Sequence, residues 1–163
     1  MLVLYEDSRQ QDGRHKNIHE YCKEMGITIV RQKLEVGDYM LDPTNGKISV
    51  DSKMDLLELS GNICSSDHRR FRAECERAKA IGIQLVFLIE EVPMYGKVDF
   101  WEVPVWTSSN QYHRKGEPMT LVDPQTLRKA MMTMVQKYGI RFEFCTKDQT
   151  PERVIKILKG AFR

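Results

Sequence analysis

The sequence predicts an α/β domain with a mixed central sheet flanked by helices. Two observations support this fold class: strand patterns joined by a turn signal come first, and strands alternate with helices afterwards. The 163 residues suit one compact domain, and 41% hydrophobic with 29% charged residues is the composition of a globular chain. We therefore expect residues 1–163 to form a single domain.

The N-terminal third of the chain contains four strand patterns and one helix pattern. Residues 2–6 (LVLYE) form an apolar run typical of a buried strand. Apolar side chains recur at helical spacing over 14–25, and a glycine follows as a helix-ending residue. Residues 27–34 are rich in β-branched side chains, while 36–41 and 47–53 flank the turn signal DPTNG. We expect the last two segments to pair as a hairpin.

The rest of the chain alternates helices with strands. Helices are expected near 54–62 and 67–81, followed by a core strand at 83–91. Proline and glycine punctuate residues 92–122, which indicates a long, partly ordered loop with one short strand. The pattern ends with a helix at 124–138, a strand at 140–145 and a final helix from Thr150 to about residue 159.

Composition excludes several classes of protein. No apolar run approaches the roughly 20 residues that cross a bilayer, and the N-terminus lacks the basic region of a signal peptide. The four cysteines are scattered without a CxxC pair, which indicates reduced thiols and a cytoplasmic protein. Because the formal net charge is only +2, binding to nucleic acid requires a local basic patch.

Strand alternation brings chemically active side chains together. In ISVDSK, Ile48 and Val50 mark the buried face, so Asp51 and Lys53 point together from the opposite, solvent-reachable face. Asp38 lies across the expected hairpin, and cross-strand neighbours on one face come within about 5 Å of each other. We therefore expect the two carboxylates to share one metal ion beside the lysine ammonium group.

These residue types suit the hydrolysis of a phosphodiester. Two carboxylates that hold Mg²⁺ or Mn²⁺ invert the negative charge that otherwise repels an anionic substrate. The metal polarises a phosphoryl oxygen and acidifies a bound water, while Lys53 orients that water or stabilises the transition state. A short D-x-K pattern also occurs on ordinary solvated sheet faces, so the pattern alone leaves that alternative open.

The order of these motifs resembles the XPF-type nuclease domain of the PD-(D/E)xK superfamily. The segments that carry the resemblance are Asp7-Ser8-Arg9-Gln10, Gly37-Asp38-Tyr39, Asp51-Ser52-Lys53 and the helix RRFRAECERAK, and the C-terminal part is similar to small phage-borne members. The resemblance implies a restriction-endonuclease-like fold. It also implies a metal-dependent endodeoxyribonuclease that cuts flap, branched or junction DNA during recombination or repair, in a bacterial or phage-infected cell.

The resemblance also implies roles for individual residues. Asp38, Asp51 and Lys53 are the expected catalytic residues with Asp7 in support, and Asp38, Asp51 and Ser52 are the expected metal positions. Asp51 and Ser52 depart from the family, which usually has Glu and Arg there, and Gln10 stands in place of a Glu. The alternatives are a solvated strand end for Asp7 and a salt-bridged surface for the helix. The expected DNA contacts are Arg9, Arg69, Arg70 and Glu74.

Other interpretations stay open at this stage. His15 and His19 have the spacing of half a zinc site, but without further ligands at suitable spacing a polar helix edge is favoured. The amphipathic final helix packs on its own domain or serves a homodimer, because XPF-type domains commonly dimerise. For the whole chain, the alternatives are a catalytically inactive DNA-binding scaffold subunit and a small-molecule enzyme with 92–122 as a lid.

Overall fold

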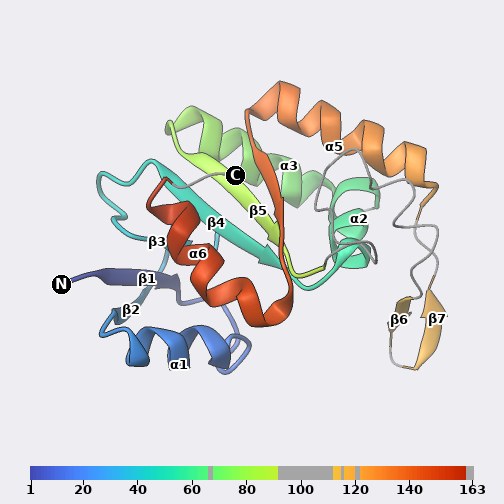
Figure 1. Cartoon of the computed structure of the whole chain (residues 1–163). Coiled ribbons are helices and arrows are strands. Elements are labelled where there is room, and N and C mark those ends of the chain that lie inside the picture. The colour runs from blue at the N-terminus through green and yellow to red at the C-terminus, as the bar shows by residue number, and fades with distance from the viewer. Residues whose placement is uncertain (66–67, 92–111, 115, 120–121, 161–163) are drawn as a thin grey trace.

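A six-stranded mixed sheet forms the centre of the protein, as the sequence predicts (Figure 1). The computed structural model describes residues 1–65, 68–91, 112–114, 116–119 and 122–160. The strand order is β2-β1-β3-β4-β5-β8, and β3 runs antiparallel to both of its neighbours while the other neighbouring pairs are parallel. The strands are β1 (Val3–Asp7), β2 (Thr28–Gln32), β3 (Tyr39–Met40), β4 (Ile48–Lys53), β5 (Gln84–Ile89) and β8 (Arg141–Phe144).

Helices cover both faces of the sheet. On one face, apolar side chains of α2, α3 and α5 form a core cluster with alternate residues of β5. On the other face, α1 and α6 form a second cluster with β1, β4 and the remaining residues of β5. Figure 1 shows α6 in front of the sheet and α3 behind it. The helices are α1 (Lys16–Glu24), α2 (Leu56–Cys64), α3 (His68–Ala80), α5 (Pro124–Tyr138) and α6 (Thr150–Leu158), with a short 3-10 turn η2 (Lys147–Gln149) before the last.

Local chemistry fixes the ends of several helices. The Asp55 side chain accepts a hydrogen bond from the backbone N–H of Glu58 and caps α2, and Asp123 caps α5 in the same way. α5 begins with Pro124 and ends at Gly139, whose φ of 64° is the left-handed conformation that glycine adopts without strain. These signals explain why the predicted helix at 124–138 is confirmed at both ends.

The segment 92–122 is described only in part. Two short antiparallel strands, β6 (Tyr112–Arg114) and β7 (Glu117–Met119), pair as a hairpin around Gly116, where one short strand was expected. Residues 92–111, 115 and 120–121 lie outside the described part of the chain. The expected partly ordered loop, and its alternative role as a lid, fall mostly on these residues. Among the residues that are described, no helix has the length and apolar character needed to cross a membrane.

The burial of β4 differs from the expectation. The predicted alternation is confirmed, because Val50 joins the core beneath α1 and α6 while Asp51 lies in register with Phe87 of the opposite core. Asp51 is only 6% exposed, so this face of β4 is not the open, solvated sheet face that the D-x-K pattern alone left possible. The reason is that β4 is an inner strand whose two faces are both covered by helices.

Candidate active site

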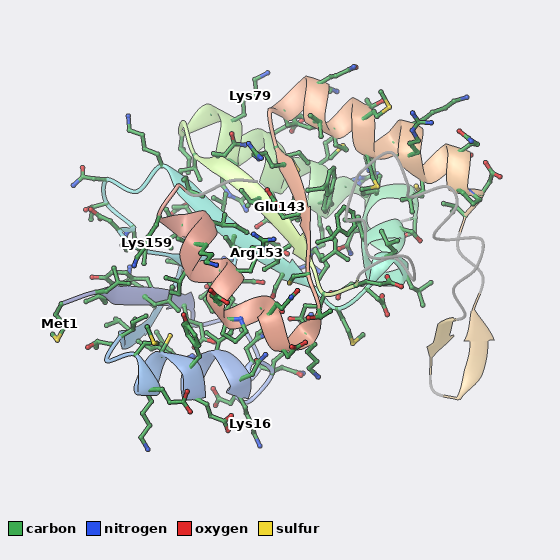
Figure 2. The ribbon with its side chains drawn as sticks, viewed as in Figure 1. Met1, Lys16, Lys79, Glu143, Arg153 and Lys159 are labelled. Atoms are coloured by element: carbon green, nitrogen blue, oxygen red, sulfur yellow. The ribbon has the colours of Figure 1, made fainter. Side chains whose placement is uncertain are left out.

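A cavity of about 590 Å³ lies beside the C-terminal ends of β1 and β4, on the side of the sheet that α2 and α3 cover. Acidic side chains lie among its lining residues, and arginines line it as well. Other cations such as Lys16 and Lys79 extend from the outer surface of the protein (Figure 2) and do not line it. The lining residues are Asp7, Arg9, Gln10, Gln11, Arg14, Gly37, Asp38, Asp51, Lys53, Asn62, Arg70, Phe71, Glu74 and Arg77.

Asp51 and Lys53 form an ion pair on the wall of this cavity. Lys53 Nζ lies 2.8 Å from Asp51 Oδ1, and the two side chains are 12% and 8% exposed. Burial raises the pKa of Asp51 to about 6; the charge of Lys53 opposes this rise and the negative charge of Asp38 adds to it. Burial lowers the pKa of Lys53, but the attraction of Asp51 outweighs it and raises that pKa, so the amine stays protonated.

Asp38 is held beside this pair by its backbone and by Ser52. Its backbone N–H donates to Val50 O at 2.8 Å, and its carbonyl accepts from Asp7 N at 2.8 Å, so the residue bridges β1 and β4. Its Oδ2 accepts from Ser52 N at 2.9 Å. Burial raises the pKa of Asp38, and the hydrogen bond from Ser52 acts in the opposite direction. Two carboxylates with raised pKa values therefore line one cavity.

Gly37 places Asp38 at this position. Its φ of 71° is left-handed, and a Cβ atom there would lie 2.1 Å from Ser49 Oγ. Its backbone N–H donates a hydrogen bond of 2.8 Å to Glu74 Oε1 on α3. Only glycine fits this combination of conformation and close approach, which gives the Gly-Asp pair of the sequence a structural reason.

One flank of α3 faces the cavity, as its spacing predicts. Arg70, Glu74 and Arg77 line the cavity, while Phe71 and Cys75 are buried in the core. Glu74 does not follow the alternative of a salt-bridged helix surface, because its carboxylate accepts a hydrogen bond from the backbone N–H of Gly37. Burial raises the pKa of Glu74, and the charge of Asp51 raises it further. Glu74, expected as a DNA contact, is thus a third acid of the cavity.

Asp7 and Arg9 form a second ion pair at the mouth of the cavity. Arg9 Nε lies 2.8 Å from Asp7 Oδ2, and Asp7 Oδ1 accepts from Leu34 N at 3.2 Å. Asp7 is only 5% exposed, so it is not a solvated strand end. Half of the Arg9 side chain is exposed and it lines the cavity, in a position to meet a ligand.

Two predicted site residues lie elsewhere. The Ser52 side chain is buried on the other face of β4, where its hydroxyl lies 3.2 Å from His15 Nε2. From that face the hydroxyl also donates to Asp38 Oδ2. Arg69 is exposed on α3 but is not one of the cavity-lining residues.

His15 is not on a polar helix edge, which corrects that expectation. It is 7% exposed, and burial lowers its pKa to about 4, so the ring is neutral near pH 7. His19 instead lies 3.0 Å from Glu6 Oε2. Across the described ranges, no three His, Cys, Asp or Glu side chains are grouped as a metal cage, and zinc gains no support.

The sequence gives no signal for three residues that line the cavity: Gln11, Arg14 and Asn62. Arg14 precedes α1, lines the cavity and pairs with Glu58 at 3.1 Å. Gln11 and Asn62 also line the cavity, and the Asn62 Oδ1 atom is buried without a hydrogen-bond partner. Nothing in the spacing of these residues marks them, because the fold alone brings these segments together.

The residues present fit a hard divalent cation. Mg²⁺ and Mn²⁺ favour oxygen ligands, and Mg²⁺ is usually held by one or two carboxylates with water completing its shell. Asp38 and Asp51 supply such carboxylates, and the charge of Asp38 raises the pKa of Asp51, a repulsion that a cation relieves.

Comparison with solved structures finds the same fold in an archaeal protein. "XPF from Aeropyrum pernix" matches with a TM-score of 0.63 and 16% sequence identity over 99% of this chain. The same protein in complex with DNA matches with a TM-score of 0.64 and 16% identity over 99% of this chain. In both comparisons the chain spans 65% of the length of the archaeal chain. A search of curated protein sequences finds no match.

Comparison with sequence families gives a match over most of the chain. The family described as "ERCC4 domain" matches residues 7–158. This range contains every acid of the cavity, from Asp7 on β1 to Glu74 on α3. The predicted resemblance to the XPF-type nuclease domain and the predicted restriction-endonuclease-like fold are both confirmed. The chain belongs to the ERCC4 domain family.

Proposed function

We propose that the protein is a DNA endonuclease that uses a divalent cation, Mg²⁺ or Mn²⁺, to hydrolyse phosphodiester bonds. The observation that carries this proposal is that Asp38, Asp51 and Lys53 line one cavity. Membership in the ERCC4 domain family supports a nuclease, and the solved structure of a relative with DNA supports DNA as the partner.

Asp38 and Asp51 would hold the cation. When bound, it polarises a phosphoryl oxygen and makes a coordinated water more acidic. Ser52 and Lys53 fix the two carboxylates, through a hydrogen bond of 2.9 Å to Asp38 and an ion pair of 2.8 Å to Asp51. Asp51 is only 6% exposed, which strengthens its attraction for a cation, while Asp38 is partly exposed and lines the same cavity.

Lys53 acts as a cation and not as a base. Its raised pKa keeps the amine protonated at neutral pH, so it has no lone pair with which to accept a proton from water. Its Nζ lies on the cavity wall and can donate hydrogen bonds to a phosphate oxygen or to the attacking water. We assign Lys53 to stabilising the negative charge of the transition state and orienting the water.

Four arginines surround the acidic centre, and we call them the arginine rim. Arg9 and Arg14 come from the segment after β1, and Arg70 and Arg77 from α3. Guanidinium groups bind phosphate oxygens with two parallel hydrogen bonds, so the rim suits a DNA backbone that passes over the cavity. A local basic rim explains how a chain with a net charge of only +2 attracts DNA.

Flap, branched or junction DNA is the proposed substrate, in a recombination or repair pathway of a bacterial or phage-infected cell. The resemblance to XPF-type domains supports this choice. A homodimer is a further proposal from that resemblance, although α6 gives it no support, because Val154 and Ile157 of that helix are buried in the core of its own domain. Analytical ultracentrifugation of the full chain distinguishes the monomer from the dimer.

A cleavage panel tests the proposal. Labelled flap, Y-shaped, four-way junction and plain duplex DNA are incubated with Mg²⁺, Mn²⁺ or EDTA. We expect metal-dependent cutting of a branched substrate that is lost in Asp51→Asn and kept in Asp148→Asn, a matched control at an exposed residue outside the cavity. Binding without cutting under all conditions would instead support the inactive scaffold subunit.

A further inference from the structure

A buried polar cluster lies behind the active site, on the far face of β4. It contains His15 and Ser52, which are 7% and 3% exposed, and neither residue lines the cavity. The His15 ring packs edge-on against Tyr39 at 5.8 Å between centroids. The proposed chemistry gives His15 no role, although burying an imidazole ring costs free energy unless its nitrogen atoms find partners.

The distances in this cluster favour one direction for its hydrogen bonds. Ser52 Oγ donates to Asp38 Oδ2 at 3.3 Å, and His15 Nε2 lies 3.2 Å from the same hydroxyl. A hydroxyl has only one hydrogen, and a carboxylate accepts it more strongly than a neutral imidazole does. If the Ser52 hydrogen points to Asp38, the matching arrangement has His15 donate to Ser52 from Nε2, while its Nδ1 faces Glu90 Oε1 at 3.9 Å, which is too long for a hydrogen bond.

This chain of hydrogen bonds ends on one oxygen of Asp38. The backbone N–H and the hydroxyl of Ser52 both donate to Oδ2, at 2.9 and 3.3 Å. Two donors from one residue fix the rotation of the carboxylate, and neither of them occupies Oδ1. Asp38 itself lines the cavity, so its orientation decides how an oxygen is presented there.

We propose that His15 is a positioning residue which, through the hydroxyl of Ser52, holds Asp38 in the orientation that binds the divalent cation. This inference rests on the proposed function. Groups that hydrogen-bond to metal ligands orient them, and their loss typically weakens metal affinity about 10- to 100-fold. His15 touches neither the cavity nor the cation, so its effect passes entirely through Ser52 and Asp38.

The first test reads the tautomer of His15 by NMR. The two-bond ¹⁵N–¹H correlations of a histidine ring show which nitrogen carries the hydrogen in the neutral form. We expect His15 in the Nε2–H form at pH 7 in the full chain without metal, because its lowered pKa keeps it neutral there. A ring with the hydrogen on Nδ1 cannot donate to Ser52 and would overturn the proposed direction.

The second test measures Mn²⁺ affinity by electron paramagnetic resonance, without any DNA. His15→Phe keeps a ring of similar size but removes the donor, and Ser52→Ala removes the hydroxyl; each should weaken Mn²⁺ binding about 10- to 100-fold. Ser52→Thr and His15→Gln keep a hydroxyl and a donor N–H and should retain most of the affinity. His19→Phe is the matched control, because His19 pairs with Glu6 and not with this cluster.

The outcomes separate this inference from the proposed function. Asp38→Asn should lose Mn²⁺ binding; if it binds as the unmodified chain does, the proposed metal site fails. If Asp38→Asn loses binding while His15→Phe and Ser52→Ala keep it, only the positioning role of His15 fails. Should His15→Phe not fold, Ser52→Ala decides the question, because a small buried hydroxyl is removed with little loss of packing.

Discussion

Replacing Asp51 with asparagine should change how the free energy of unfolding depends on pH. Burial raises the pKa of Asp51 in the folded protein from 3.8 to about 6. The folded state therefore holds this proton more tightly than the unfolded state does. The resulting stability is fully present below the unfolded pKa and is lost as the pH rises through about 6.

The magnitude follows from the size of the shift. A change of about two pKa units corresponds to about 3 kcal/mol, since each unit is worth about 1.4 kcal/mol. The asparagine of Asp51→Asn cannot ionise, so the variant does not lose this stability as the pH rises. The unfolding free energy of the variant, minus that of the unmodified protein, should therefore increase by about 3 kcal/mol between about pH 3 and pH 7.

Urea unfolding at several pH values without metal measures this difference, with Asp148→Asn as an exposed control whose pH profile should follow the unmodified protein. Added Mg²⁺ should stabilise the unmodified protein at pH 7 and have little effect on Asp51→Asn, because a ligand that binds only the folded state shifts unfolding by mass action. Parallel pH profiles for the unmodified protein and Asp51→Asn would refute the claim that a buried, ionising carboxylate lies at this position.

Three further variants test the geometry around the cavity. Gly37→Ala should lower the unfolding free energy clearly more than Gly26→Ala does. Both glycines have positive φ (71° and 66°), but only at Gly37 would an added Cβ lie against Ser49 Oγ. Urea unfolding of the two variants measures this difference, and equal losses would contradict the close approach. Glu74→Ala should cost about 1–3 kcal/mol in the same assay, because the Gly37 N–H loses its acceptor, whereas Glu74→Gln keeps an acceptor oxygen and should cost little. Lys53→Ala should lower kcat for DNA cleavage about 10²- to 10³-fold while Mn²⁺ affinity is largely retained, and an equal loss of metal binding would argue against separate roles.

The order of the elements and the alternation of β4 could be predicted because they depend on local sequence. Apolar periodicity, the capping residue Asp123 and the helix-ending Gly139 each act within a few residues of the chain. The same alternation correctly paired Asp51 with Lys53 on one face. These features need no knowledge of which segments meet in three dimensions.

The burial of the site could not be predicted in the same way. The face of β4 that carries Asp51 is covered by α2, α3 and α5, and α5 begins only at Pro124, far along the chain from β4. His15 is buried by residues that are distant in the sequence, since Ser52, Tyr39 and Glu90 surround its ring. A pattern read along the sequence shows which face a residue is on, but not whether a distant helix covers that face.

Glu74 illustrates a different limit. The flank of α3 with Arg70 and Arg77 has the spacing of either a salt-bridged surface or a binding site. The choice is made by the backbone N–H of Gly37, which takes Glu74 as its acceptor and so draws the carboxylate into the cavity. A backbone group leaves no mark in the sequence, and this contact appears only in the folded structure.

Diffraction from crystals soaked in MnCl₂, collected where Mn²⁺ scatters anomalously, tests the central claim most directly. A shared metal site requires an anomalous peak within ligand distance of carboxylate oxygens of both Asp38 and Asp51, and its disappearance in Asp38→Asn crystals. Well-diffracting crystals with no peak in the cavity, or with peaks only at surface carboxylates such as Asp148, would contradict the proposal that these two acids hold the cation.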